Sequence, residues 1–375
     1  MKIIHLSDLH LGKRVHEFSM LDDQRYILKQ ILEHVAEEHP DVVILAGDIY
    51  DKPVPPAEAV QLFDQFLCGL AEQSVEVMII SGNHDSAERI AFGGKLMEHS
   101  GVHVSPVYDG DVKPVELEDA YGIVQFFLLP FIKPIHVRRG YAEEEIESYT
   151  DAMRTAISHM ERNADARQVL VTHQFVTGAE RSDSEEISVG GTDNVDVTVF
   201  DGFDYVALGH IHKPQWVKSG KIRYSGSLMK YSFSESLQNK SVTLLDWKAK
   251  DDLTVTTIPL QPEQDMRVIQ GKLEDLLEHA EPSDDWIRAE LTDRELIPYA
   301  LERLRMSYPN LMELVYLYQE EQIAASNTEV KLVPEQSLVE LLGGFLDSVY
   351  QYQLEEEPEA YQLMEEICKE AEQEK

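Results

Sequence analysis

The chain has 375 residues, of which 43% are apolar, and this is enough for two or three compact units with an ordinary soluble core. Its 33 basic and 69 acidic residues give a net charge of −36, which taken alone speaks against a polyanionic partner. The longest apolar stretch, Phe126 to Ile132, is too short to span a bilayer, so we expect no membrane anchor. Cys68 and Cys368 lie far apart in sequence, which argues against a disulfide framework and favours a reducing cytoplasm.

From residue 1 to about residue 260, strand-like runs alternate with helix-like runs, which predicts a layered α/β domain with a largely buried sheet. The expected strands are Lys2–Ser7, Val42–Ala46, Val75–Ser81, Val124–Pro130, Gln168–Thr172 and Tyr205–Leu208. The expected helices are Asp22–Glu38, Ala57–Leu70 and Glu143–Asn163. Three later strands follow one another with short turns and suggest an antiparallel, hairpin-rich edge of the same domain: Ile222–Ser225, Ser241–Trp247 and Leu253–Leu260.

Beyond Leu260 the pattern changes, and "QPEQDMR" indicates a domain boundary. A small β-α-β unit is expected there, with strands at Trp286–Leu291 and Leu311–Tyr318. Between them an apolar helical stripe holds Ile297, Leu301, Leu304 and Tyr308. The sequence therefore predicts a large α/β domain over residues 1–262 and a small α/β domain over residues 263–330, which is called the capping domain below.

The last part of the chain, residues 331–375, is expected to be a helical tail. Ser337 and Glu340 have the spacing of a capping box at a helix start. A second, acidic helix is expected after Pro358. The first helix has a wide apolar face that favours docking on a partner, and the expected anchors are Leu342, Phe345 and Val349. The alternative is that both helices pack back on the capping domain.

Five of the expected strands end in side chains that bind metals or transfer protons. The first runs into "HLSDLHLG", where Asp8 and His10 point the same way because side chains alternate along an extended chain. Each motif alone has a bland alternative, such as a turn or a surface pair. Ligand sites of open α/β sheets form beyond the carboxyl ends of strands, so all these positions are ready to converge. The others are Asp48, Asn83 with His84, His173, and His210 with His212.

The number and type of these donors favour a dinuclear metal centre. The set without His84 is too large for one ion and suits two, with Asp48 as the expected bridge between them. Mixed imidazole, carboxylate and amide donors suit Mn²⁺, Fe²⁺ or Zn²⁺ better than a Mg²⁺ site built of oxygen ligands alone. Paired metals promote phosphoryl displacement, so the residues predict phosphoester hydrolysis.

In their order along the chain, the motifs D-x-H, G-D, G-N-H-D, a lone His and G-H-x-H resemble those of the calcineurin-like metallophosphoesterases. Longer segments resemble the SbcD family of bacterial exonuclease subunits: "IIHLSDLHLG", "VVILAGDIYD", "IISGNHDS", "LPFIKP", "ALGHIHKPQ" and "YSGS". The resemblance covers the catalytic region to about residue 260, and the capping unit and tail more loosely. It implies a layered metallophosphoesterase sandwich.

The resemblance also implies roles for these residues. One metal, manganese by family preference, would be held by Asp8, His10, Asp48 and His212. The second would be held by Asp48, Asn83, His173 and His210. His84 would stay unligated and stabilise the transition state or protonate the leaving 3′ oxygen. Archaeal relatives carry a histidine at the position of Asp51, so a role for this carboxylate stays open.

The implied activity is 3′→5′ exonuclease and hairpin-opening endonuclease action on DNA, in a homodimer working with the SMC-like ATPase SbcC. Two stretches without Asp or Glu, residues 121–142 and 213–234, fit phosphate contacts near the metals, although chance clustering is the alternative. The candidate DNA contacts are Lys133, Arg138, Arg139, Lys213, Lys218, Arg223 and Lys230. Two other functions stay open: hydrolysis of a small phosphoester or phosphoprotein, and a scaffold subunit without turnover.

Overall fold

The computed structural model describes residues 1–185, 193–218, 220–318, 361 and 364. It contains two compact units, Met1–Val315 and Tyr316–Lys375. The expected tail anchors, Leu342, Phe345 and Val349, lie outside the described residues. No helix in the described ranges is both long and apolar enough to cross a membrane.

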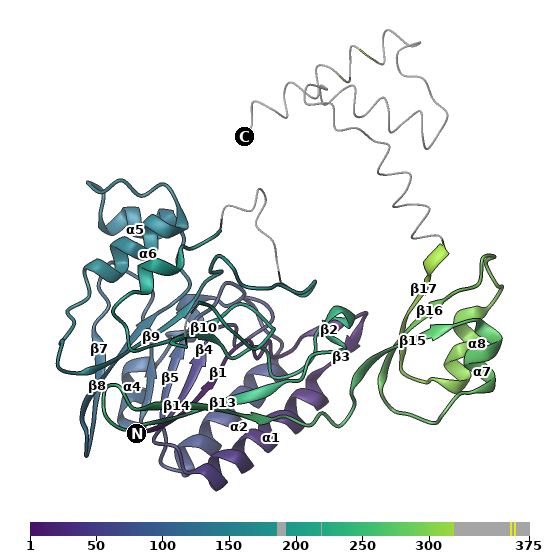
Figure 1. Cartoon of the computed structure of the whole chain (residues 1–375), viewed down its shortest axis with the longest axis horizontal. Helices are drawn as coiled ribbons and strands as arrows, with labels where there is room; N and C mark the ends of the chain where they lie inside the picture. Colours follow the sequence, from purple (N-terminus) through teal and green to yellow (C-terminus); the bar gives the residue numbers. More distant parts are fainter. Residues whose placement is uncertain (186–192, 219, 319–360, 362–363, 365–375) are drawn as a thin grey trace. The chain divides into compact units, whose positions relative to one another are not determined.

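The first sheet of the larger unit has six strands in the order β14-β13-β1-β4-β5-β6 (Figure 1). Strands β1, β4, β5 and β6 run parallel to one another, and β13 and β14 form an antiparallel edge beside β1. The bounds are β1 (Lys2–Leu6), β4 (Val42–Ala46), β5 (Glu76–Ile80), β6 (Val102–Val104), β13 (Ser241–Trp247) and β14 (Leu253–Pro259). Nearly every residue of β1, β4 and β5 is buried, as their continuous apolar runs require.

The second sheet also has six strands, in the order β11-β12-β10-β9-β8-β7. Its four inner strands are parallel, and β7 and β11 pair antiparallel at the two edges. The bounds are β7 (Pro114–Asp119), β8 (Gly122–Leu129), β9 (Arg167–His173), β10 (Tyr205–Gly209), β11 (Gln215–Trp216) and β12 (Ile222–Tyr224).

The expected hairpin-rich edge is therefore partly wrong. The strand predicted at Ile222–Ser225 is β12, which pairs parallel with β10 in the second sheet. Only β13 and β14 form the expected hairpin, in the first sheet. The segment after Tyr224 carries the chain from one sheet to the other, and sequence spacing alone does not reveal such a crossing.

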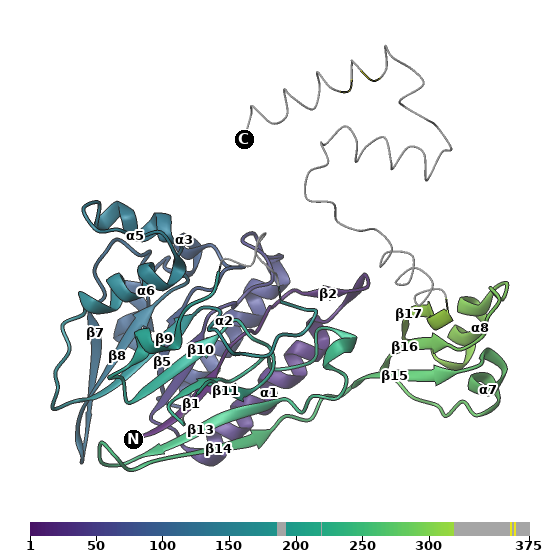
Figure 2. The same cartoon turned by 45° about the horizontal axis from the view of Figure 1, so that its top comes forward.

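The two sheets pack face to face with helices on their outer sides. Ile44 and Ile80 of the first sheet share a buried cluster with Phe126 and Val171 of the second. The outer face of the first sheet is covered by α1 (Leu21–Glu38) and α2 (Ala57–Glu72), and that of the second by α5 (Pro134–Gly140) and α6 (Tyr149–Ser158) (Figure 2). The expected α/β sandwich is confirmed. Smaller elements are β2 (Arg14–Val15), β3 (Phe18–Ser19), α3 (Ala87–Ile90), α4 (Gly94–Met97) and the 3₁₀ turns Glu98–Ser100, Val197–Phe200 and Phe233–Glu235.

Helix α6 is shorter than the predicted helix Glu143–Asn163. It begins after Ser148, whose hydroxyl accepts a hydrogen bond from the backbone N–H of Asp151 at 3.1 Å. The Asp151 carboxylate accepts the N–H of Ser148 in return, also at 3.1 Å. This capping box fixes the start of the helix, so residues 143–147 lie outside it.

A three-stranded sheet, in the order β15-β16-β17, forms the region expected to cap the catalytic domain. Its bounds are β15 (Met266–Gly271), β16 (Trp286–Leu291) and β17 (Leu311–Tyr316), with helices α7 (Leu273–Glu278) and α8 (Ala300–Ser307). The predicted unit lacked β15 and α7. Leu304 and Tyr308 of the predicted stripe are buried, as expected of a helix that covers a sheet.

Candidate metal centre

The predicted donors converge at the carboxyl ends of parallel strands in both sheets. Asp8 and His10 follow β1, Asp48 follows β4, and Asn83 follows β5, all in the first sheet. The second sheet supplies His173 at the end of β9, and His210 and His212 after β10. Contacts between these side chains join residues as distant in sequence as His10 and His212. The edge at which the sheets meet is therefore the candidate centre.

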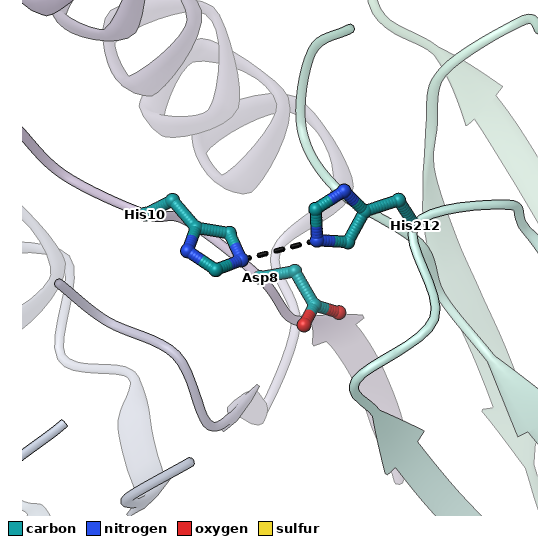
Figure 3. Close-up of side chains that lie close together, drawn as sticks. All are labelled: Asp8, His10 and His212. Atoms are coloured by element: carbon teal, nitrogen blue, oxygen red, sulfur yellow. Dashed lines mark hydrogen bonds between the residues drawn. The ribbon is translucent and has the colours of Figure 1, made fainter. Parts of the chain in front are cut away.

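Asp8, His10 and His212 form the first group of donors. Figure 3 shows the two imidazole rings facing each other with the Asp8 carboxylate beside them. The Nε2 atoms of His10 and His212 are 3.1 Å apart, and one donor atom from each of the three side chains lies within 4.8 Å of the others. All three side chains are buried, so water cannot satisfy these donors freely.

A second group forms around Asn83. Its Oδ1 atom is 3.0 Å from Nε2 of His173 and 2.9 Å from Nδ1 of His210. Asp48 lies between the groups, because its Oδ2 atom is 3.2 Å from Nε2 of His173 and 3.5 Å from Nε2 of His10. The structure thus brings together all seven predicted donors, with Asp48 next to both halves.

The donor chemistry fits divalent metal ions. The facing nitrogens of His10 and His212 share at most one proton when both rings are neutral, and two buried carboxylates, Asp8 and Asp48, stand beside them. Cations would satisfy the remaining lone pairs and offset the cost of burying the carboxylates. Nitrogen donors among the ligands favour a transition metal or zinc over calcium.

The charges of the side chains alone favour an ionised Asp48. Burial on its own would raise the pKa of this carboxyl, but His173, His10 and His84 together outweigh burial and hold the pKa well below its usual range. Burial likewise opposes a charge on His173, yet Asp48 raises the pKa of His173 to about 9. Because metal ligands must be deprotonated, metal binding here would release the proton that this pair holds.

The backbone is bent sharply at the donors, so the extended conformation predicted for Asp8 and His10 is wrong. Asp8, His10 and Asp48 have φ angles of 54°, 44° and 49°, and His210 has 105°, all in a region that non-glycine residues rarely adopt. Hydrogen bonds hold this conformation, since the Asp8 N–H donates to the Gly47 carbonyl at 3.1 Å and the His10 N–H donates to the Asp48 carbonyl at 2.9 Å. Such strain is typical of functional sites.

The glycines before the donors allow the loops to approach closely. A Cβ atom at Gly82 would overlap the carboxylate of Asp48, and one at Gly209 would overlap the backbone carbonyl of Ala46 in the opposite sheet. The glycines of the G-N-H-D and G-H-x-H motifs are thus required by packing as well as by turns.

His84 lies at the edge of the centre and is half-buried. Its backbone N–H donates to Oδ1 of Asp48 at 2.9 Å, and its ring nitrogen Nδ1 is 3.1 Å from the carbonyl oxygen of Asp51. A proton on Nδ1 would be donated to this carbonyl, and the other ring nitrogen, Nε2, would point away from Asp51. His84 also forms, with His10 and Asp48, a group that could hold a metal, so the geometry allows a ligand role beside the predicted proton transfer.

Several residues that support the centre are not among the predicted donors. The Asp85 carboxylate accepts the backbone N–H groups of Ile49, Tyr50 and Gly82 at 2.9 to 3.0 Å and thereby joins the G-D and G-N-H-D loops. Gln24 of α1 donates to the His10 carbonyl at 2.7 Å. Asp85 belongs to the quoted motif, so the sequence offered a sign of its role. Gln24 lies in an ordinary amphipathic helix, and nothing in the sequence distinguishes it.

Two of the predicted DNA contacts are engaged inside the protein. Arg223 of β12 is 6% exposed, and its Nε atom donates to the Thr243 hydroxyl at 3.1 Å. Lys230 pairs with Asp265 at 2.8 Å and donates to the Ser236 carbonyl at 2.7 Å. Both side chains are therefore held by the protein itself and are not part of the proposed DNA surface; a stretch of sequence without acidic residues does not reveal which of its cations are buried.

The other candidate cations reach solvent. Lys133, Arg138 and Arg139 are exposed around α5, and none forms an ion pair with another described residue. Lys218 is also exposed, whereas Lys213 pairs with Glu180. The loop before α5 lies close to the donor strands, because Gln174, which follows His173, donates to the Ile132 carbonyl at 2.9 Å.

Comparisons with known proteins agree with this geometry. The calcineurin-like phosphoesterase family matches residues 1–214, and the family described as type 5 capsule protein repressor C-terminal domain matches residues 262–350. The chain is 34% identical over 347 residues to the SbcD subunit of nuclease SbcCD from Staphylococcus epidermidis, covering 91% of this chain and 92% of that protein.

Two solved structures are also similar. A dimetal phosphatase from Danio rerio has a TM-score of 0.44 at 10% identity, covering 70% of this chain and 99% of that chain. The phosphoesterase Yfce from E. coli has a TM-score of 0.29 at 15% identity, covering 70% of this chain and all of that chain. Both scores are too low to add to the assignment, which rests on the sequence families. The chain belongs to the calcineurin-like phosphoesterases and, within them, to the SbcD family of nuclease subunits.

Proposed function

We propose that this chain hydrolyses DNA phosphodiesters with two Mn²⁺ ions, as the nuclease subunit of a complex with the SMC-like ATPase SbcC. The observation that carries the proposal is the convergence of seven buried or half-buried donors from five strand ends, with Asp48 next to both halves. A relative that spans nearly the whole chain is named as a subunit of nuclease SbcCD, and this name supports the DNA substrate and the partner.

The first metal would be held by Asp8, His10, Asp48 and His212, and the second by Asp48, Asn83, His173 and His210. When bound, the pair supplies Lewis-acid stabilisation of the attacking and leaving oxygens of an in-line displacement. Asp48 contributes the negative charge shared by both halves. The buried histidines hold neutral nitrogen donors in place and exclude water from the back of the centre.

His84 would act on the leaving group. Its Nδ1 atom faces the Asp51 carbonyl at 3.1 Å, which supports a tautomer or imidazolium with a proton on that nitrogen. A second proton on Nε2 would pass to the leaving 3′ oxygen as the P–O bond breaks. We propose 3′→5′ exonuclease action on duplex ends and endonuclease action on hairpins and single strands.

The DNA backbone would track past α5. Lys133, Arg138 and Arg139 lie exposed there, and Lys218 follows the last donor at a short distance in sequence. Phosphate contacts of this kind position the substrate without reading its sequence. Since the chain carries a net charge of −36, we expect weak DNA affinity without the partner.

We divide the chain into a nuclease domain over residues 1–262, a capping domain over residues 263–330 and a partner-binding tail over residues 331–375. Leu342, Phe345 and Val349 are the proposed anchors on the base of the SbcC coiled coil, and the complex would act near the nucleoid. The resemblance to the SbcD family also leads us to propose a homodimer within a heterotetramer.

The test uses the purified full chain, stripped of metal with a chelator and reloaded with Mn²⁺, Mg²⁺ or Zn²⁺. End-labelled duplex and hairpin DNA and bis-p-nitrophenyl phosphate are the substrates. Asp48→Asn should lower the metal content from about two ions per chain and abolish hydrolysis of all three. The control is Asp246→Asn on the exposed side of β13, which should behave as wild type. Hydrolysis of the small ester alone by the wild type, with or without SbcC, would contradict the DNA substrate.

A further inference from the structure

His212 is backed by a buried cluster of charged and hydroxyl groups. Glu235, Lys240 and Glu185 are 0%, 6% and 7% exposed, and Ser184 is half-buried beside them. Glu235 and Lys240 form an ion pair at 2.5 Å. Burying such a pair costs free energy that well-packed apolar side chains would not. The buried pair is therefore better explained by the groups that it holds in place than by a gain in stability.

The cluster engages the polar atoms of His212 on the side away from the other donors. The His212 N–H donates to Oε1 of Glu185 at 2.7 Å, and the His212 carbonyl accepts from Nζ of Lys240 at 2.8 Å. The ring nitrogen Nδ1 lies 2.7 Å from the Ser184 hydroxyl and 3.4 Å from Oε1 of Glu235. Nε2 is thereby left to face His10 at 3.1 Å.

The directions of these hydrogen bonds form a chain. The Ser184 hydroxyl donates to the Glu235 carboxylate, so it accepts from Nδ1–H of His212. The Glu235 carboxylate in turn accepts from Lys240. A proton held on Nδ1 leaves the Nε2 lone pair free for a cation, and a carboxylate at the end of the chain makes that lone pair more basic.

Lys240 fixes the position of the carboxylate. Besides Glu235 and the His212 carbonyl, its ammonium group donates to the Ser227 hydroxyl and to Oε1 of Gln238, each at 2.9 Å. Four acceptors around one buried ammonium group leave Glu235 little freedom to rotate, and the Ser184 hydroxyl is held with it.

We infer that Ser184 and Glu235, held by Lys240, are positioning residues that set the metal affinity of the His212 half of the centre. This inference rests on the proposed function, because it requires a cation at Nε2 of His212. The Asn83 half has no contact with the cluster among the described residues, so the two halves should respond differently to its disruption.

In the experiment, the metal-free full chain is titrated with Mn²⁺. Binding is measured by calorimetry and by competition with a fluorescent chelator. Glu235→Gln keeps the size of the side chain and removes its charge. One of two binding events should weaken by about 10- to 100-fold while the other is unchanged. The Mn²⁺ concentration that gives half-maximal hydrolysis should rise by the same factor. Turnover at saturating Mn²⁺ should stay within a few-fold of wild type.

Glu76→Gln is the matched control, because Glu76 also pairs with a histidine, His103, at 2.8 Å but in another part of the fold. It should leave both binding events unchanged. Ser184→Ala is the second variant, since it leaves the buried ion pair intact and should weaken the same event by a smaller factor. Its effect tests the inference even where Glu235→Gln does not fold.

Each outcome has a separate meaning. Wild-type Mn²⁺ affinity at both sites in Ser184→Ala and in folded Glu235→Gln would overturn the inference, even with a lowered melting temperature, because the cluster would then be structural only. Equal weakening of both binding events would also overturn it. A wild-type chain that binds no Mn²⁺ would instead overturn the proposed function, and the inference with it.

Discussion

Adding one methyl group at Gly82 should disable the centre although no donor residue is replaced. The new Cβ atom would lie 2.7 Å from Cγ of Asp48, whereas ordinary contact begins near 3.4 Å. The Asp48 carboxylate oxygen and backbone nitrogen are closer still, so rotating the side chain does not relieve the clash. The backbone nitrogen of Asp48 would lie 2.4 Å from the new atom, so Asp48 must retreat by about 1 Å (3.4 minus 2.4) and both halves of the centre lose their shared carboxylate.

A displacement of this size has a predictable cost. Misplacing a reacting group by about 1 Å lowers rates by roughly 10²-fold, which corresponds to about 2.7 kcal/mol of activation free energy. Overpacking should also lower the free energy of unfolding by about 1 to 3 kcal/mol. We expect Gly82→Ala to show both effects in hydrolysis of bis-p-nitrophenyl phosphate with Mn²⁺ and in chemical denaturation.

The matched control is Gly220→Ala, because a Cβ atom at Gly220 meets no atom within 4 Å. It should keep wild-type turnover, metal content and stability. Turnover of Gly82→Ala within twofold of wild type, at wild-type metal content, would refute the reasoning that the glycine is required by the position of Asp48.

Three further predictions concern other parts of the chain. His84→Gln should keep its metal content while turnover falls roughly 10²-fold, with exposed His99→Gln unchanged; loss of metal would make His84 a ligand. Hydrogen bonds from Arg167 and the amino terminus outweigh partial burial and lower the pKa of Asp119 to about 2. The ionised carboxylate therefore stabilises the folded state above pH ~4, and this stabilisation is lost as the pH falls towards 2. Asp119→Asn should therefore cost about 1 to 2 kcal/mol of unfolding free energy at pH 6 and almost nothing at pH 2, and an equal loss at both would contradict the assignment. Deleting residues 335–375 should leave a Mn²⁺-dependent nuclease that no longer co-purifies with SbcC; unchanged co-elution would place the docking surface elsewhere.

The buried parallel strands were the most predictable part of the fold. The bounds of β4 were predicted as they occur, because this strand is a continuous apolar run bordered by Asp41 and Gly47. The edge strand β7 was not predicted, since "PVELED" is half-exposed and acidic and resembles a loop. The place of β12 in the second sheet also escaped prediction, because it depends on where the chain crosses between layers.

The same distinction applies to the centre. Asp8, Asp48 and His173 could be found because each lies within two residues of the end of a strand, so local pattern and position coincide. Glu235 could not be found, because it lies in a short 3₁₀ turn and meets His212 only through tertiary packing. Arg223 shows the opposite error, in which a favourable local composition hides a buried side chain.

Because the donors are divided between two sheets, the complete centre can form only late in the synthesis of the chain. A nascent chain that has completed β1, β4 and β5 holds Asp8, His10, Asp48 and Asn83, but it lacks the histidines that follow β9 and β10. An intact centre therefore exists only after more than half of the chain has emerged and the two layers have docked. Because metal then binds the assembled form and not its parts, saturation at 100 times the dissociation constant adds about 2.7 kcal/mol to folding. Partly folded chains therefore lack the complete donor set, and any metal that requires this set stabilises only the assembled form.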